Sequence, residues 1–185
     1  MSQASTKKAL FLDRDGVVNH DAGFVSTKDE VVFNEGIFAL VSKANFLEYK
    51  VIIITNQSGI ARGFFSEIQF LELMEWMNLE FKLRGCKIDK FYYCPYHPEA
   101  LIARYKKKSF LRKPSPGMIQ LAKEEFSIDL SKSFLVGDRL IDIQAGNLAG
   151  VGRNFLLSDL SFTPKEIKNL KFEKIRNLHE VTNQL

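Results

Sequence analysis

Two aspartates separated by one residue, Asp13 and Asp15, follow a short apolar run near the start of the chain. The run itself, Ala9-Leu10-Phe11-Leu12, is typical of a buried strand, so both carboxylates should leave the end of that strand close together. Gly16, directly after them, lets the backbone turn sharply. Such a pair can share Mg2+ while one carboxylate attacks phosphorus and the other handles the leaving group's proton. Calcium loops and ordinary turns contain the same short pattern, so it needs support from elsewhere.

Further residues of the kinds that bind phosphate follow in order along the chain. The β-branched run 51–54 ends in Thr55, and the apolar run 134–136 is followed by Asp138. Lys113 lies between these runs, directly before a proline. Open parallel sheets hold their ligands at the carboxyl ends of their strands. A hydroxyl, a lysine and a further acidic cluster delivered to that edge are what a dianionic phosphate and its metal would need.

Apolar strand-like runs alternate with amphipathic stretches. Ser66 is placed to cap a helix, and apolar residues recur at helical spacing from Phe70 to Phe81. The repeated strand-then-helix order predicts an α/β fold, a doubly wound, Rossmann-like parallel sheet with helices on both faces. Residues 158–185 are predicted to be a polar extension with short helical pieces. The predicted strands are 9–12, 51–54, 91–94, 134–136 and, last, 151–156, and the predicted helices are about 36–49, about 66–83, one from about 116 and one ending near 147.

Length and composition are those of an ordinary globular protein. The 185 residues suffice for one core, so a single domain over residues 1–185 is expected, and 45% of the residues are hydrophobic and 26% charged. No apolar run approaches the roughly 20 residues that span a membrane, and the polar start of the chain predicts no secretory signal. Two cysteines, Cys86 and Cys94, argue against a disulfide framework and favour a reducing cytoplasm.

The charge of the chain leaves two classes of partner open. The formal net charge is +4, which suits an anionic small substrate as well as nucleic acid. The densest basic run lies in a predicted loop and comprises Arg104 with Lys106-Lys107-Lys108. It is equally consistent with a solvated surface and with a region that steers anions toward the site.

With these motifs in order, the chain resembles the haloacid dehalogenase superfamily of aspartate-nucleophile phosphatases. It is similar above all to the D-glycero-D-manno-heptose 1,7-bisphosphate 7-phosphatases and their histidinol-phosphatase relatives, over about residues 10–155. The resemblance implies a single phosphatase domain with a minimal cap, because no inserted segment is long enough for a cap domain. The residues that carry it are Phe11 to Gly16, Asn19, Asp21 to Val25, Thr55-Asn56-Gln57-Ser58-Gly59-Ile60-Ala61-Arg62-Gly63, Cys94 to Pro98, and Arg112-Lys113-Pro114-Ser115-Pro116-Gly117-Met118.

The resemblance and the chemistry of the side chains together assign the catalytic roles. Asp13 is expected to be the covalent nucleophile, and Asp15 the general acid and then the general base. Thr55 should donate its hydroxyl to the transferring phosphoryl group, joined by the backbone N–H of Asn56. Lys113 should supply fixed positive charge for the phosphoryl oxygens.

The same resemblance implies a magnesium site and a set of substrate contacts. The metal ligands would be Asp13, Asp138 and the backbone carbonyl of Asp15, with Asp142 ordering Lys113 or metal-bound water from behind. Arg62 could reach a second phosphate, although a surface arginine reads equally well. The expected substrate contacts are Asp21, Ala22, Gly23, Phe24, Thr55, Asn56, Gln57, Ser58, Arg62, Arg112, Lys113 and Arg139.

A structural zinc, present in many relatives, is expected to be absent. Those relatives use a Cys-x-His pair and a later Cys-x-Cys before the Arg-Lys-Pro motif. Here Cys94 is retained, and His97 beside the expected position brings the count to two ligands, whereas zinc usually takes four. A zinc-free loop ordered by aromatic packing is therefore predicted. The positions that match the other three ligands are Tyr96, Ser109 and Leu111.

The expected activity is Mg2+-dependent release of the 7-phosphate from the heptose bisphosphate in lipopolysaccharide precursor synthesis. Histidinol phosphate and the 3′-phosphate of a nucleic acid end are alternative substrates, the second because such enzymes share the D-x-D-G and T-N-Q-x-G-I patterns. A phosphate-binding or scaffold protein on the same fold is a non-enzymatic alternative. The expected partner is a small phosphorylated sugar, with no nucleic acid and no membrane, and the family suggests a monomer.

Overall fold

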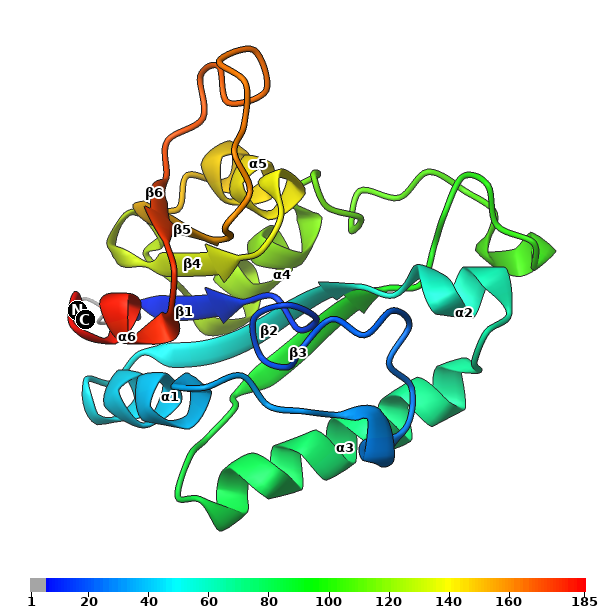
Figure 1. Ribbon diagram of the computed structural model, residues 1–185, viewed down its shortest axis with the longest axis horizontal. Helices are drawn as coiled ribbons and strands as arrows, with labels where there is room; N and C mark the ends of the chain where they lie inside the picture. Colours follow the sequence, from blue (N-terminus) through cyan, green and yellow to red (C-terminus); the bar gives the residue numbers. More distant parts are fainter. Residues whose placement is uncertain (1–5) are drawn as a thin grey trace, which may run out of the picture.

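The computed structural model describes residues 6–185 and has a parallel β-sheet at its centre (Figure 1). Its six strands lie in the order β3-β2-β1-β4-β5-β6, and every neighbouring pair is parallel. This confirms the predicted doubly wound α/β class. The strands are β1 (Ala9–Leu12), β2 (Lys50–Asn56), β3 (Lys90–Cys94), β4 (Phe134–Gly137), β5 (Arg153–Leu157) and β6 (Glu173–Ile175).

Helices cover both faces of the sheet (Figure 1). Helices α1 (Ile37–Phe46), α3 (Glu67–Leu83) and α6 (Leu178–Thr182) lie on one face, and α4 (Gly117–Phe126) and α5 (Leu140–Ala149) on the other. No helix within residues 6–185 is long and apolar enough to cross a membrane. The remaining helices are short: α2 (Ser58–Arg62) and the 3-10 helices η1 (Lys28–Glu30), η2 (Ala103–Tyr105) and η3 (Leu130–Lys132).

Strand β1 is buried on both sides, which explains why its sequence is apolar throughout rather than alternating. Leu10 and Leu12 join the core under α1 and α3, whereas Ala9 and Phe11 join the core under α4 and α5. Because successive side chains of a strand point to opposite faces, one run of four apolar residues supplies both cores. The segments after β1 and β3 at the carboxyl edge, 13–36 and 95–116, carry only η1 and η2, as expected of a minimal cap.

The capping motif predicted at Ser66 is present. The Ser66 hydroxyl accepts a hydrogen bond from the Gln69 backbone N–H at 3.1 Å, and the Gln69 side chain accepts one from the Ser66 N–H at 2.8 Å. The predicted helix 36–49 ends earlier, at Phe46, because the chain turns at Glu48, whose φ is +61°.

The prediction that strand 151–156 is the last strand was wrong. That strand is β5, and the polar tail adds both β6 and α6 to the fold. Of the three β6 residues only Ile175 is buried, so the strand lacks the apolar run that marks the others. Helix α6 did have a signal, because Asn177 and Glu180 form a capping box, and its Leu178 and Val181 are buried.

The order of the strands fixes where a ligand can bind. The chain runs outward from β1 to β2 and β3, and then returns to the other side of β1 for β4, β5 and β6. In open α/β sheets the crevice at this reversal point, at the carboxyl ends of the strands, is the usual binding site. Here the reversal lies between β1 and β4, and the Asp13 backbone N–H donates to the Val136 carbonyl at 3.0 Å across it.

Candidate active site

Lys113 joins two carboxylates that come from distant parts of the chain. Its ammonium nitrogen lies 2.6 Å from an oxygen of Asp13, directly after β1, and 2.6 Å from an oxygen of Asp142, in the first turn of α5. It also donates to the Ile54 carbonyl at 3.0 Å. All three side chains are almost completely buried. A buried ammonium with three acceptors cannot move freely, so Lys113 supplies a fixed positive charge beside Asp13.

The backbone of Lys113 is held by Asn56, at the end of β2. The Asn56 amide nitrogen donates to the Lys113 carbonyl and its amide oxygen accepts from the Lys113 N–H, both at 3.0 Å. Asn56 lines the pocket, as sequence reasoning expected, but its side chain is engaged by Lys113. The Asn56 side chain therefore fixes the position of Lys113 instead of standing free for a ligand.

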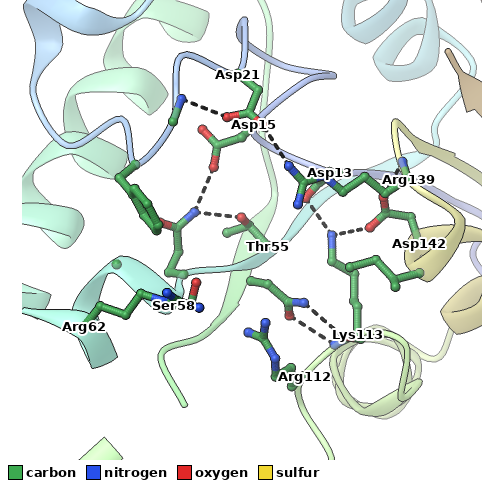
Figure 2. A pocket seen from close by; sticks show the side chains of 16 residues that line it. Asp13, Asp15, Asp21, Thr55, Ser58, Arg62, Arg112, Lys113, Arg139 and Asp142 are labelled. Atoms are coloured by element: carbon green, nitrogen blue, oxygen red, sulfur yellow. Dashed lines mark hydrogen bonds and ion pairs between the residues drawn. The ribbon is translucent and has the colours of Figure 1, made fainter. Parts of the chain in front are cut away.

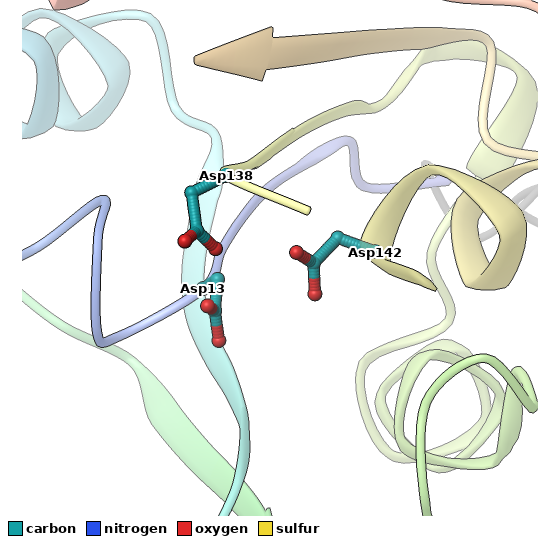
Figure 3. A group of neighbouring side chains, drawn as sticks. All are labelled: Asp13, Asp138 and Asp142. Carbon is teal, nitrogen blue, oxygen red and sulfur yellow. The ribbon is translucent and has the colours of Figure 1, made fainter. Parts of the chain in front are cut away.

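Three carboxylates converge at the reversal point of the sheet (Figure 3). Asp13, Asp138 and Asp142 each offer an oxygen within 4.8 Å of the other two, and Asp138 follows β4. Among residues 6–185, buried Asp138 Oδ1 finds no hydrogen-bond donor. Carboxylate oxygens are the ligands that Mg2+ prefers, and an unsatisfied buried oxygen is costly unless a cation completes it. The donor set therefore fits a hard divalent cation.

Gly16 is needed for the approach of the two acidic segments. Its φ is +96°, a conformation that side chains rarely adopt, and a Cβ at this position would lie 2.4 Å from Asp138 Oδ2. The glycine of the D-x-D-G pattern thus lets the loop after β1 pass directly against the loop after β4.

The electrostatics of the site reflect its burial. Burial raises the pKa of Asp13 well above the usual aspartate value, and the two neighbouring carboxylates add to this while Lys113 opposes it. Burial acts to lower the pKa of Lys113, but Asp13 and Asp142 hold it above its usual value. Burial, with Asp142, raises the pKa of Asp138 to about 6. Lys113 contacts Asp13 and Asp142, whereas Asp138 has the Arg139 guanidinium at 3.7 Å, so a divalent cation would balance the excess negative charge of the three carboxylates.

Thr55 and Asp15 are joined by Gln57. The Gln57 side-chain amide donates to the Thr55 hydroxyl oxygen at 2.8 Å and to Asp15 Oδ2 at 3.0 Å. Thr55 thereby accepts one hydrogen bond and keeps its own hydroxyl proton free to donate. Gln57 is almost completely buried, so its side chain is held firmly and orients both groups.

These side chains line a pocket of about 350 Å³ (Figure 2). Among residues 6–185, its lining includes all the expected catalytic residues and, except Ala22, all the expected substrate contacts; Asp138 lies outside it. Gly59 and Ile141 also line the pocket, although neither was predicted to be a catalytic or substrate-binding residue. The lining residues are Asp13, Asp15, Asp21, Gly23, Phe24, Thr55, Asn56, Gln57, Ser58, Gly59, Arg62, Arg112, Lys113, Arg139, Ile141 and Asp142.

Arginines border the pocket on two sides. Arg139 lies 3.0 Å from Asp21 and 3.7 Å from Asp138, so its charge is already paired. Arg62 and Arg112 differ, because the buried Arg62 Nε has no hydrogen-bond partner within residues 6–185. Burial, together with nearby Arg62, lowers the pKa of Arg112. Two guanidiniums that repel each other at a pocket wall form a site suited to an anion.

The loop that follows β3 is held by side-chain packing and hydrogen bonds. Cys94 is fully buried, and burial raises the pKa of its thiol, so the reactive thiolate is disfavoured. Lys107 lies over the Tyr96 ring at 3.8 Å, and the Leu111 N–H donates to the Ser109 hydroxyl at 3.2 Å. Within residues 6–185, the acidic trio of Figure 3 is the one group of three potential ligands found.

Comparison with known proteins places this geometry in a family. The model of the polynucleotide kinase 3 phosphatase family matches residues 12–175. The chain is 51% identical over 152 residues to the D-glycero-alpha-D-manno-heptose-1,7-bisphosphate 7-phosphatase of Burkholderia mallei, covering 82% of this chain and 80% of that protein. It is 41% identical over 181 residues to the corresponding beta-heptose enzyme of Photorhabdus laumondii, covering 88% and 96%.

A solved structure shares the fold as well. The D,D-heptose 1,7-bisphosphate phosphatase of B. bronchiseptica, crystallised with magnesium and phosphate, is 30% identical and superposes with a TM-score of 0.79 over 96% of this chain and 97% of that one. The sheet order, the carboxylates at its reversal point and these matches agree: the chain belongs to the haloacid dehalogenase superfamily of phosphatases.

Proposed function

We propose that this single-domain chain is a Mg2+-dependent phosphatase that releases the 7-phosphate of D-glycero-D-manno-heptose 1,7-bisphosphate. The observation that carries the proposal is the pocket, in which Asp13, Thr55 and Lys113 surround a space that fits a phosphoryl group. The names of the relatives supply the sugar, and the relatives act on either the alpha or the beta anomer.

In the first step a carboxylate oxygen of Asp13 bonds to phosphorus while the bond from phosphorus to the sugar oxygen breaks. Asp15 gives its proton to that oxygen, so the sugar leaves as an alcohol. Water then attacks the phosphorus of the aspartyl phosphate, Asp15 takes a proton from it, and inorganic phosphate leaves with Asp13 restored. Thr55 and the Asn56 N–H stabilise the phosphoryl oxygens through both steps.

The metal would be held by the carboxylates of Asp13 and Asp138 and by the backbone carbonyl of Asp15. When bound, Mg2+ offsets negative charge on the phosphoryl group and on the carboxylates. Asp142 is better placed to hold Lys113, to which it is joined at 2.6 Å. Its role is to keep the ammonium directed at Asp13.

The pKa of Asp138 predicts how magnesium activation depends on pH. Because a proton on this carboxylate competes with the metal, the Mg2+ concentration that gives half-maximal activity should rise as the pH falls below about 6. The rise should approach tenfold per pH unit, the limit for one competing proton. Activity titrated with Mg2+ between about pH 5 and 7.5 measures it, with saturating Mg2+ at each pH as the control. An activation constant independent of pH would contradict the assignment.

Arg62 and Arg112 are the groups proposed to bind the phosphate that stays on the sugar. They line the pocket away from the acidic trio, and neither has an acidic partner within 4 Å in the described part of the chain. Guanidinium groups suit bidentate binding of phosphate. Two phosphate-binding positions in one pocket favour a bisphosphate over a monophosphate such as histidinol phosphate.

A phosphate-release panel tests the substrate. It contains both heptose 1,7-bisphosphate anomers, fructose 1,6-bisphosphate, histidinol phosphate and a 3′-phosphorylated oligonucleotide. We expect the heptose bisphosphates to have the highest kcat/KM and the product to keep its 1-phosphate, as seen by phosphorus NMR. Release of the 1-phosphate, or preference for another member of the panel, would refute the proposal.

The oligonucleotide is included because the matching family model is described as polynucleotide kinase 3 phosphatase and because the chain has the D-x-D-G and T-N-Q-x-G-I patterns. Nucleic acid substrates would show a steep fall of activity with salt, because phosphate contacts release counterions. We expect the heptose bisphosphate activity to change little over the same salt range. The proposed partner is therefore a small phosphorylated sugar. We propose as well that the chain acts as a monomer in the cytoplasm.

Asp15→Asn should slow the enzyme by about 100- to 10,000-fold on the sugar bisphosphate, because the alkoxide leaving group needs a proton. On nitrophenyl phosphate, whose leaving group is stable as an anion, the loss should be clearly smaller. Steady-state kinetics on both substrates measures the difference. Equal losses on the two would count against proton donation by Asp15.

We also propose that the loop after β3 binds no structural zinc. Within this loop the His97 N–H donates to the Tyr105 carbonyl at 3.1 Å, and the Tyr96 ring packs on that of Tyr105. Elemental analysis of protein purified without added metal or chelator should find well under one zinc per chain. About one tightly bound zinc per chain would show the prediction to be wrong.

A further inference from the structure

Arg14 lies between the two aspartates of the D-x-D pattern. Among the fully buried residues that the structure describes, it has the largest side chain. Its guanidinium faces Asp15: Nε lies 3.0 Å from both carboxylate oxygens, and the terminal NH2 lies 2.7 Å from Oδ1. The Asp15 side chain is 21% exposed and lines the pocket. A completely buried cation is thus directed at the one aspartate of the pattern that reaches furthest into solvent.

The guanidinium is itself held by two other segments. The same NH2 group donates to the Val25 carbonyl at 2.9 Å, in the loop that carries Asp21, Gly23 and Phe24. The guanidinium carbon also lies 5.5 Å from the centre of the Phe70 ring in α3. One nitrogen therefore contacts both the Asp15 carboxylate and the loop on the substrate side of the pocket.

Stability gives no full account of this burial. Arg14 NH1 is buried and has no hydrogen-bond partner within residues 6–185. A buried guanidinium with an unsatisfied donor carries a desolvation cost that an apolar side chain of similar volume would avoid. The geometry does fit a positioning task, because a fork of parallel N–H groups fixes a carboxylate in both direction and plane.

We infer that Arg14 is a positioning residue that fixes the Asp15 carboxylate toward the pocket and ties it to the loop around Val25. Asn19 and Gln57 donate to Asp15 Oδ1 and Oδ2 at 3.1 and 3.0 Å from other sides, so the carboxylate cannot rotate away from the fork. The inference rests on the proposed function, because it takes Asp15 to be the group that transfers the proton.

The test is a double-mutant cycle of Arg14→Lys and Asp15→Asn. Lysine keeps the charge but cannot form the fork. Alone, Arg14→Lys should lower kcat by about 10- to 100-fold on the alkyl phosphate of the panel that the enzyme hydrolyses best, with KM changed less than about threefold, because a small displacement of a catalytic group costs about this much. In the Asp15→Asn background, the same change should cost less than about threefold. Arg153→Lys, at a surface pair with Glu173, is the matched control and should leave activity unchanged.

Each other outcome counts against the inference. If the fold-reductions in kcat of the two single variants multiply in the double mutant, or if Arg14→Lys causes no loss, Arg14 does not act through Asp15. Thermal melts of Arg14→Lys and Arg14→Gln accompany the kinetics, and failure of both to fold would overturn the positioning role in favour of a structural one. A wild-type enzyme inactive on every phosphate monoester would refute the proposed function as well, whereas an active enzyme with multiplying losses would refute only the role of Arg14.

Discussion

Asp13→Asn should lower turnover by about four orders of magnitude or more, because the carboxamide is no nucleophile toward phosphorus. The metal-free melting temperature should change little. The substitution removes the attraction to Lys113, but it also removes a buried charge that Asp138 and Asp142 repel. Lys113 keeps its other carboxylate partner, so no buried ammonium is left unpaired.

Phosphate release in the presence of Mg2+ and thermal melts in chelator measure the two effects. Asp29→Asn is the matched control, since it makes the same change at an exposed position in η1. It should leave both activity and melting temperature unchanged. A variant at position 13 that retains a tenth of the wild-type kcat would rule out the covalent mechanism.

Lys113→Met should impair both catalysis and folding. It leaves two buried carboxylates without their cation, and breaking a buried pair in this way costs about 3–5 kcal/mol. Turnover should fall by about a thousandfold or more, because a fixed positive charge beside the phosphoryl group is lost.

The stability loss of Lys113→Met should depend on pH. Without the ammonium, which opposes the effects of burial and of the neighbouring carboxylates, the folded-state pKa of Asp13 lies still further above its unfolded value. The folded variant then binds more protons than the unfolded chain, so its deficit relative to wild type shrinks as the pH falls toward 4. Urea unfolding in chelator between about pH 4 and 8 measures this, with exposed Lys123→Met as the control. A deficit that is constant with pH would contradict the assigned ion pairs.

Positioning explains most of this site. The side chains expected to react come from the carboxyl ends of β1, β2 and β4. The structure adds a second set of side chains that holds such groups: Asn56 on Lys113, Gln57 on Thr55, and Arg14 on Asp15. Catalytic groups work only within a narrow range of directions. The amide and guanidinium groups that hold the reactive side chains are therefore as informative about mechanism as the reactive side chains themselves.

Local sequence determined the sheet and the placement of its reactive groups. Short apolar runs such as 9–12 and 51–54 are typical of buried strands, and parallel strands deliver whatever follows them to one edge. Hence Asp13, Thr55 and Asp138 could be placed near one another before any coordinates. Strand β6 was not predicted, because it has only one buried residue and therefore no apolar run in its sequence. Its position comes from pairing with β5.

Only the tertiary structure decided which side chains pair. Asn56 and Lys113 are 57 residues apart, and Arg139 and Asp21 are 118 residues apart, so no spacing along the chain encodes either contact. Arg14 is adjacent to Asp15, yet the sequence pattern of an arginine between two acids predicts an exposed side chain in a turn. It is buried because the loop at Val25 and the Phe70 ring of α3 cover it, and that depends on how distant segments pack rather than on the residues beside it.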